Sequence, residues 1–418
     1  MSIISSGNVN EVIFKTLSML NRKSIEHGEI TGYIFYKMLQ YEGIYSEQEL
    51  LDYTMVGILH DIGLYKEEEI RNISDFEQAK PWPHSVYGFL FLKYLSPIGD
   101  KAEAVLFHHL YYKRYKYVDM KYGHVTECLS LADQMDNYMR QQNSSMEKDY
   151  FVRYRDIRFS GKALDLFFKA EKEMGITKAL ASGEYKQELV EVLSKKFFTE
   201  RYKRGFLEML VYTIDFRSEA TVVHTMSTVY FAKQLAMLMN VDGADLKILS
   251  YGALLHDLGK LVIPLDILEA PGRLSDEQMR IMRGHVQITE MILKGLVDDN
   301  VLEIAIRHHE KLDGTGYHRG LSEKDLTKPQ QIVAVADILS ALYGKRSYKE
   351  AFDSEKIKGI LKSDADNHKI SEEAVNCLME NYDLVIGNYE KEKEAILGLY
   401  FNIKNQYNII MKRFADFN

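Results

Sequence analysis

Apolar positions recur at helical spacing through most of the chain. The residues that follow His224 on one helical face are Thr228, Phe231, Leu235 and Leu238. A second such face leads to His256 and continues to Lys260, through Leu246, Leu249 and Ala253. Ser275 and Gln278 have the spacing of a capping box, which predicts that the helix carrying His285 begins there. Convincing strand-like alternation is lacking, so we predict an all-α fold.

The chain also contains a diverged repeat with an offset of about 200 residues. Leu-His-Asp-Ile-Gly at 59–63 returns as Leu-His-Asp-Leu-Gly at 255–259, and a His-His pair stands at 108–109 and at 308–309. In both copies one histidine precedes the His-Asp step, another follows it, and an aspartate follows the His-His pair. Solenoid repeats recur every few tens of residues, so this long offset indicates two whole domains in tandem.

These signals predict four segments along the chain. A first domain covers 1–140, a helical linker covers 141–200, a second domain covers 201–387, and a C-terminal helix covers 388–418. The last segment is amphipathic, and we expect it to pack against the chain or to form a dimer contact.

Composition narrows the classes of function. The chain has 53 Lys and Arg against 61 Asp and Glu, a net charge of -8, which argues against binding of duplex nucleic acid. Its two cysteines, Cys128 and Cys377, are too few for a disulfide framework, as expected in a reducing compartment. We see neither a signal peptide nor an apolar run long enough for a transmembrane helix. We therefore expect a cytoplasmic protein that does not contact membranes.

The repeated histidines carry the candidate chemistry. Ten of the 13 histidines belong to the two sets, whereas scattered structural histidines, such as His124 and His368, would not keep one order twice. Imidazoles and carboxylates together suit Zn, Fe, Mn or Ni, and the lack of cysteine ligands disfavours a structural zinc site. A His-Asp step can supply a carboxylate that bridges two metals about 3.5–4 Å apart. Such a centre activates water and neutralises the charge of a phosphodiester.

The His-Asp step, followed by HHEKLDGTGYHRGL at 308–321, resembles the HD-GYP branch of the HD phosphohydrolase superfamily. The resemblance covers roughly residues 200–385. It implies a centre of two divalent transition-metal ions, Fe or Mn, in which Asp257 is the bridge and Lys260 contacts the scissile phosphate. The ligands that it implies are His224, His256, Asp257, His285, His308, His309 and Asp337.

The resemblance also implies how the substrate is held. Gly314, Gly316 and Tyr317 match the loop that gives the family its name. The family carries R-P-x-K nine residues after the last metal aspartate, and this chain has Arg-Ser-Tyr-Lys there. Arg346 and Lys349 are therefore expected to bind substrate phosphates, one through a planar fork and the other as a point charge.

Three positions depart from the family pattern. The proline of the GYP motif is His318, which leaves the stiffness of the substrate loop open. The proline of the second motif is Ser347, a change that we expect to be tolerated. Members with a third metal carry a glutamate four residues before the first histidine, where this chain has Ala220, with Glu219 one step off that face. We therefore expect two metals.

The first repeat resembles the wider HD superfamily over about residues 10–140. The position that matches Lys260 is Leu64, the GYP loop is missing, and Gln142 stands where Arg346 would be expected. We therefore expect a degenerate HD-like domain that regulates or supports the second domain without degrading cyclic dinucleotides itself. Metal binding is left open there, and the candidate ligands are His27, His60, Asp61, His84, His108, His109 and Asp133.

The family resemblance implies a metal-dependent phosphodiesterase that converts a cyclic dinucleotide, cyclic di-GMP foremost, to the linear dinucleotide. Two alternatives stay open on the sequence. One is a receptor or signalling scaffold that binds a cyclic dinucleotide without turnover. The other is a phosphohydrolase for another nucleotide, such as cyclic GMP-AMP. A homodimer and a signalling protein partner are compatible with each of these functions.

Overall fold

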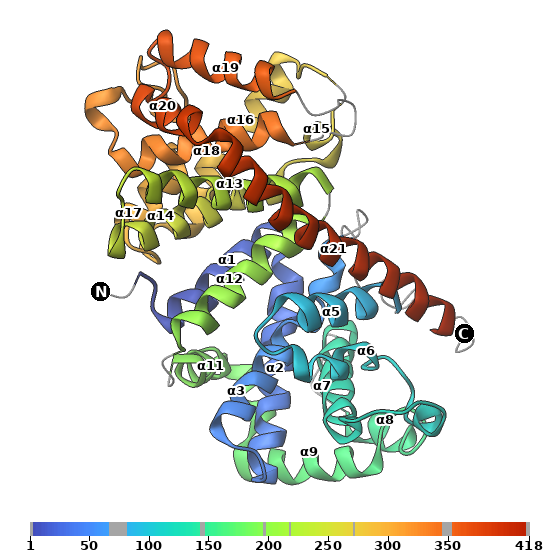
Figure 1. The fold of residues 1–418 in the computed structure, drawn as a ribbon. Helices are drawn as coiled ribbons and strands as arrows, with labels where there is room; N and C mark the ends of the chain where they lie inside the picture. Colours follow the sequence, from blue (N-terminus) through green and yellow to red (C-terminus); the bar gives the residue numbers. More distant parts are fainter. Residues whose placement is uncertain are drawn as a thin grey trace. The chain divides into compact units, whose positions relative to one another are not determined.

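The computed structural model describes residues 3–66, 82–142, 147–194, 198–216, 219–270, 272–344 and 353–414. Over these residues the chain is helical, with isolated bridges but no β-strand, so the predicted all-α class is confirmed (Figure 1). None of the helices in these ranges is both long enough and apolar enough to cross a membrane.

The chain divides into two compact units. Unit 1 comprises Met1–Thr16 and Leu210–Asn402, and unit 2 comprises Leu17–Met209 and Ile403–Asn418. Three helices contribute residues to both units, namely α1 (Ser6–Leu20), α12 (Glu200–Asp215) and α21 (Tyr382–Phe414).

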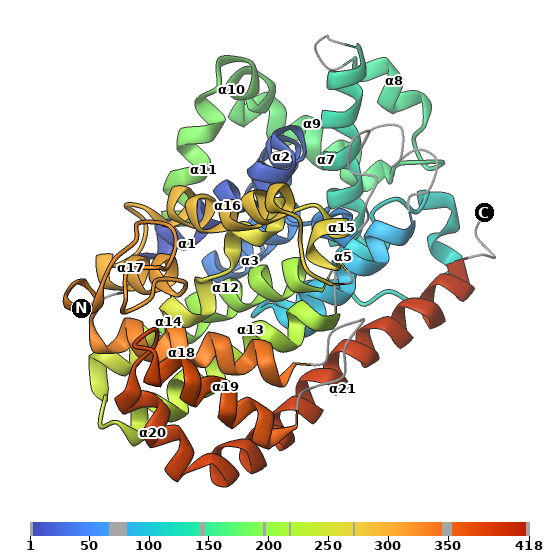
Figure 2. The same ribbon diagram turned by 90° about the horizontal axis from the view of Figure 1, so that it is seen from above.

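Unit 1 is built on α13, which packs against α14 and α18, while α14 also packs against α17 (Figures 1 and 2). The helices that belong to unit 1 alone are α13 (Glu219–Leu238), α14 (Gly243–Leu255), α15 (Leu265–Leu268), α16 (Asp276–Leu293), α17 (Asp299–Arg307), α18 (Lys328–Tyr343), α19 (Ser354–Asp366) and α20 (Glu372–Glu380). Two 3-10 turns accompany them, η5 (Leu258–Val262) and η6 (Glu323–Asp325).

Local signals in the sequence explain where these helices lie and begin. Phe231 and Leu235 are fully buried, as the predicted face of α13 requires. Helix α16 begins with the predicted capping box, in which Ser275 and Gln278 satisfy each other's backbone N–H groups. Helix α17 begins after Asp298, whose carboxylate accepts the N–H of Asn300.

Unit 2 repeats this order of elements, because α2 packs against α3 and α7, and α5 packs against α6 and the turn η1. Its helices are α2 (Arg22–Glu42), α3 (Glu47–Ile58), α5 (Trp82–Leu95), α6 (Glu103–Leu106), α7 (Gly123–Gln142), α8 (Lys148–Arg153), α9 (Gly161–Met174), α10 (Ile176–Ser182) and α11 (Glu184–Ser194). The 3-10 turns of this unit are η1 (Ile62–Lys66), η3 (Gly99–Lys101) and η4 (Tyr112–Tyr117).

The compact units differ from the predicted segments. The part of α1 up to Thr16, predicted within the first domain, belongs to unit 1. Residues 141–200, predicted as a linker, supply helices α9 and α11, which pack on α2 and bury side chains such as Leu164 and Phe167. The C-terminal helix begins at Tyr382 instead of 388, and its last turns pack within unit 2. There the ring of Phe414 stacks on Trp82 with centroids 4.5 Å apart. The apolar faces of α9, α11 and the last turns of α21, for which the sequence indicates no partner, pack against other elements of unit 2.

A glycine three residues after the histidine of each His-Asp step allows a close approach of two elements. In unit 1, a Cβ at Gly259 would overlap the carbonyl oxygen of His285, and η5 packs against α16 there. In unit 2, a Cβ at Gly63 would overlap the carbonyl of His84 in the same way. Helix α14 accordingly ends at Leu255, and the helical face predicted to reach Lys260 is interrupted by the tighter turn η5.

We predict that Gly259→Ala destabilises the protein by about 1–3 kcal/mol or more, because the new methyl group meets a backbone carbonyl that cannot rotate away. Urea unfolding of the full chain measures the change. Gly359→Ala is the matched control, since its Cβ enters open space in α19 and should be neutral or mildly stabilising. Equal unfolding midpoints for Gly259→Ala and the unaltered chain would contradict the close approach.

Candidate metal centre

Unit 1 brings all seven side chains of the second repeat together. They come from α13, from the residues just after α14 and α17, from α16 and from α18. Five of them are buried, and His224 and His309 are partly exposed at the edge of the cluster. The assembled set is His224, His256, Asp257, His285, His308, His309 and Asp337.

The carboxylate of Asp257 lies between two pairs of histidines. Its Oδ2 atom is 3.3 Å from Nε2 of His224 and 3.1 Å from Nε2 of His256. Its Oδ1 atom is 3.4 Å from Nε2 of His285 and 3.9 Å from Nε2 of His308. One carboxylate thus faces two separate groups of nitrogen ligands, which is the arrangement that a bridging ligand needs.

The carboxylate of Asp337 also faces histidines of both groups. Its Oδ1 atom is 3.1 Å from Nε2 of His224, and its Oδ2 atom is 3.6 Å from Nδ1 of His309. The ligand atoms accordingly fall into two sets that could each hold an ion, one with His224, His256 and Asp257 and one with His285, His308 and His309.

Helix ends orient the imidazoles. Nδ1 of His256 lies 2.7 Å from the carbonyl of Ala253, and Nδ1 of His308 lies 2.7 Å from that of Ala305. Both carbonyls lie in the last turn of a helix, where no further helical N–H is available to them. A neutral ring that donates its Nδ1–H there presents the lone pair of Nε2 to the cluster, as second-shell partners of metal ligands commonly do.

Two potential metal-ligand atoms of the cluster have no hydrogen-bond partner in the described part of the protein. Nε2 of His256 and Oδ1 of Asp257 are buried and have no hydrogen-bond partner. Each such atom costs about 1–3 kcal/mol if nothing satisfies it. Burial lowers the pKa of His285 to about 4 and that of His309 to about 3, so both rings are neutral ligands near pH 7. The residues therefore fit a centre of divalent cations.

A lysine and a further carboxylate lie beside this cluster. The ammonium of Lys260, in η5, contacts Oδ2 of Asp257. Asp215, at the end of α12, is buried, and its Oδ2 has no hydrogen-bond partner. Burial raises the pKa of Asp215 to about 7, and the negative charge of Asp257 acts in the same direction. Sequence reasoning placed Lys260 at the site but missed Asp215, which belongs to no motif.

Ser340 is a second residue that sequence reasoning missed. Its Oγ atom lies 2.6 Å from Nδ1 of His224 and is buried. It stands three residues after Asp337 on α18, so the ligand and the residue that orients another ligand share one helical face. That spacing is the signal from which Ser340 could have been found.

The glycines of the predicted substrate loop are required by its backbone. Gly314 has φ 78°, in the left-handed region that favours glycine. A Cβ at Gly316 would overlap the backbone of Glu310 and Lys311. These constraints place Tyr317, whose N–H donates to the carbonyl of His309 at 3.1 Å.

The ring of Tyr317 lies against the cluster. Its centroid is 4.6 Å from that of His309, and the guanidinium of Arg283 lies 5.0 Å from the same centroid. Arg283 is exposed on α16. Sequence reasoning missed this cation because it stands outside the recognised motifs.

His318, which replaces the proline of the motif, has φ 109°. Proline is held near −65°, so it could not take this backbone conformation. The imidazole Nε2 lies 2.9 Å from Oε2 of Glu290, and the guanidinium of Arg319 donates to Oε1 of Glu290 at 2.8 Å. The carboxylate of Glu310 accepts the N–H groups of Arg319 and Leu321 at 2.7 and 2.9 Å. Two glutamates thus anchor the loop without proline.

The structure describes some of the other predicted site residues and not others. Arg346 and Lys349 lie outside the described residues. The first-repeat residues come together in unit 2, from α2, α5, α7 and the segments after α3 and α6. They are His27, His60, Asp61, His84, His108, His109 and Asp133.

Comparisons with known proteins show what the chain is similar to. Residues 208–371 match the family model described as HD domain. The 3'3'-cGAMP-specific phosphodiesterase 1 of Vibrio cholerae serotype O1 is 24% identical over 390 residues, 88% of this chain and 90% of that protein. The 3'3'-cGAMP-specific phosphodiesterase 2 of the same organism is 29% identical over 278 residues, 60% of this chain and 53% of that protein.

A third relative is the cyclic di-GMP phosphodiesterase response regulator RpfG of Xanthomonas campestris pv. campestris. It is 34% identical over 157 residues, so the chain spans 41% of its length. A solved structure of a cyclic GMP-AMP specific phosphodiesterase of V. cholerae, V-cGAP3, has a TM-score of 0.54 at 18% identity, over 92% of this chain and 99% of that one. It supports the helical fold.

We predict that His318→Pro releases the loop that carries Tyr317, because a pyrrolidine ring cannot adopt φ 109°. The N–H groups of Arg319 and Leu321 should exchange with solvent roughly tenfold faster or more, which corresponds to about 1.4 kcal/mol. Hydrogen exchange of the full chain measures this change.

The control for this prediction is His318→Asn, because asparagine tolerates positive φ better than most residues. It should keep most of the protection even though its ion pair with Glu290 is lost. Unchanged exchange in His318→Pro would show that the backbone at 318 does not hold the loop.

Proposed function

We propose that the HD domain at residues 208–371 is the catalytic part of a metal-dependent phosphodiesterase that opens a cyclic dinucleotide to the linear dinucleotide. The observation that carries the proposal is the carboxylate of Asp257, which faces two groups of histidines and contacts the ammonium of Lys260. The relatives, whose names describe phosphodiesterases of cyclic dinucleotides, support the same reaction class.

The proposed cofactor is a pair of divalent transition-metal ions, Fe or Mn. When bound, such ions activate water and neutralise phosphate charge. One ion would be held by His224 and His256, the other by His285, His308 and His309. Asp257 would serve both ions, and Asp337 would add its carboxylate.

The chain's own residues would bind and position the phosphodiester. The ammonium of Lys260 can donate to a non-bridging phosphate oxygen and offset the charge that builds on it. Arg346 and Lys349, which follow α18 in the sequence, are proposed to bind the substrate phosphates. Hydrolysis adds one water across a P–O bond of one of the two phosphodiesters. The ribose oxygen of that bond is the leaving group and becomes a free hydroxyl, so a linear dinucleotide with a terminal phosphate results.

We propose 3'3'-cGAMP as the first substrate to test and cyclic di-GMP as the second. The sequence alone favours cyclic di-GMP, which is the usual substrate of the resembled family. The comparisons favour 3'3'-cGAMP, because the relative aligned over 390 residues is named as specific for it. The relative named for cyclic di-GMP aligns over only 157 residues.

A receptor without turnover is the weaker alternative. A receptor needs no carboxylate that could bridge two metal ions and no unpaired ligand atoms such as Nε2 of His256. A hydrolytic metal centre needs both. A homodimer, a signalling protein partner and a cytoplasmic location stay predictions from the sequence.

Arg283 and Tyr317 extend the proposed substrate site. Arg283 contacts the ring of Tyr317 and makes no ion pair with any described carboxylate, so its charge is available. Being exposed beside the cluster, it is suited to a substrate phosphate or to the edge of a guanine base. We propose Arg283 as a substrate-binding residue.

Asp257→Ala is predicted to abolish turnover of both cyclic dinucleotides, because it removes the proposed bridge and the partner of Lys260. Chromatography of 3'3'-cGAMP and cyclic di-GMP, incubated side by side with the metal-loaded protein, measures the linear products. The unaltered chain should hydrolyse 3'3'-cGAMP faster than cyclic di-GMP. Full activity of a folded Asp257→Ala protein would refute the mechanism, and binding of both compounds without any turnover would favour the receptor.

Arg283→Ala is predicted to raise KM about tenfold and to leave metal content unchanged, since a charge-assisted contact contributes about 1.5–3 kcal/mol. Arg280→Ala is the matched control on the same helix, because Arg280 is exposed and already paired with Glu277 at 2.7 Å. If both variants have the KM of the unaltered chain, Arg283 does not bind the substrate.

A further inference from the structure

We propose that unit 2 holds a second centre of divalent transition-metal ions, and that this centre stabilises the unit without cleaving phosphodiesters. The residues that form it are His27, His60, Asp61, His84, His108, His109 and Asp133.

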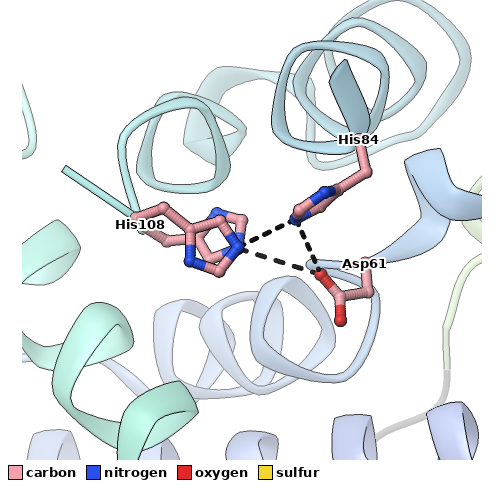
Figure 3. A group of neighbouring side chains, drawn as sticks. Asp61, His84 and His108 are labelled. Atoms are coloured by element: carbon pink, nitrogen blue, oxygen red, sulfur yellow. Dashed lines mark hydrogen bonds and ion pairs between the residues drawn. The ribbon is translucent and has the colours of Figure 1, made fainter. Parts of the chain in front are cut away.

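The geometry of this cluster starts with the carboxylate of Asp61. Its Oδ1 atom is 3.6 Å from Nε2 of His84 and 3.8 Å from Nε2 of His108, and both rings are turned toward it (Figure 3). Its Oδ2 atom is 3.4 Å from Nε2 of His60 and 3.8 Å from Nε2 of His27. Each oxygen therefore faces its own pair of histidines.

This division of ligands matches that around Asp257 in unit 1. The second carboxylate matches as well, because Oδ1 of Asp133 is 3.1 Å from Nε2 of His27 and Oδ2 is 3.6 Å from Nδ1 of His109. The corresponding two distances of Asp337 are also 3.1 and 3.6 Å. The same carboxylate oxygens thus face matching histidine nitrogens in both units, which indicates that the same kind of ion can be held.

The outer partners of these histidines are also in place. Nδ1 of His60 lies 2.7 Å from the carbonyl of Gly57, and Nδ1 of His108 lies 2.6 Å from that of Val105. Nδ1 of His27 lies 2.6 Å from the carboxylate of Asp136, which Arg140 also contacts. A carboxylate that orients a histidine from behind is a characteristic second-shell partner of a metal ligand.

Among the described residues, no lysine or arginine pairs with the two carboxylates of this cluster. Oδ1 of Asp61 and Nε2 of both His60 and His108 are buried without a hydrogen-bond partner. Among the described ion pairs, Asp61 and Asp133 are paired with histidines alone, whereas Asp257 in unit 1 also contacts Lys260. Asp133 also accepts amide N–H groups of Gln134 and Asn137, each at 2.8 Å. Two buried carboxylates without a lysine or arginine favour a further positive charge, and bound metal ions would supply it.

The cluster is more closed than the one in unit 1. The side chain of His27 is 7% exposed against 16% for His224, and that of His109 is 9% exposed against 24% for His309. The position of Lys260 is taken by Leu64, which is buried and cannot bind phosphate. Closed coordination is typical of structural metal sites, whereas catalytic sites keep an open position.

The test uses the full chain with Asp257→Ala, which removes the proposed bridge of unit 1 and leaves the ligands of unit 2 intact. The protein is loaded with Mn²⁺, separated from free metal, and its bound manganese is measured by mass spectrometry. We expect Asp257→Ala to retain manganese and the double variant Asp61→Ala, Asp257→Ala to retain none. A folded Asp257→Ala protein without bound metal overturns the site.

The structural role is tested by thermal unfolding of the same Asp257→Ala protein with and without a chelator. Removal of the metal should lower the unfolding midpoint by at least about 4 °C, because an ion that binds only the folded state stabilises it. The double variant should not respond to the chelator. If Asp61→Ala impairs folding, His109→Ala, at the more exposed edge, replaces it. Retained metal with an unchanged midpoint overturns the structural role.

Discussion

The structure of unit 1 depends on one constraint, which is that a buried carboxylate must lie between four imidazoles. Both oxygens of Asp257 lie within 3.9 Å of two histidine nitrogens each. Bringing these groups together requires η5 to lie against α16, and that packing leaves no room for a Cβ at Gly259. Because the cluster contains buried atoms without a hydrogen-bond partner among the described residues, binding of a cation there is favourable.

Helix ends provide most of the orientation that this constraint demands. His256 and His308 each follow the last residue of a helix, where a free carbonyl three residues earlier accepts the ring N–H. The same helix ends carry the negative pole of the helix dipole, which favours a cation nearby. The recurrence of a histidine at a helix end, with the same bond, in His60 and His108 shows that the geometry is built locally and can be repeated.

This local construction explains what could be predicted from the sequence. The helices, the capping box at Ser275 and the assembly of the ligand set follow from spacing along the chain, since the histidines occupy helix faces and helix ends. Arg283 and Glu290 could not be identified in this way, because their partners belong to a loop whose path depends on tertiary packing. The sequence predicts a helical linker at 141–200, and the packing of its helices on α2 could not be predicted for a similar reason. Their apolar faces have no motif, and only the folded chain shows that α2 covers them.

One side chain beside the ligands accounts for part of the difference between the two clusters. In unit 1 the ammonium of Lys260 lies on Asp257, so part of the negative charge is balanced before any ion binds. If a bound ion took the place of the ammonium at the carboxylate, Lys260 would be available to an anionic substrate, at a site whose edge histidines are open to solvent. In unit 2 the same position is Leu64, which can neither balance the charge of Asp61 nor bind phosphate. The proposed ions would there meet part of the charge of Asp61 and Asp133, beside the histidines that face both carboxylates. If both proposals hold, the exchange of lysine for leucine has two linked consequences, because it removes a contact to the substrate phosphate and makes unit 2 depend more on bound metal.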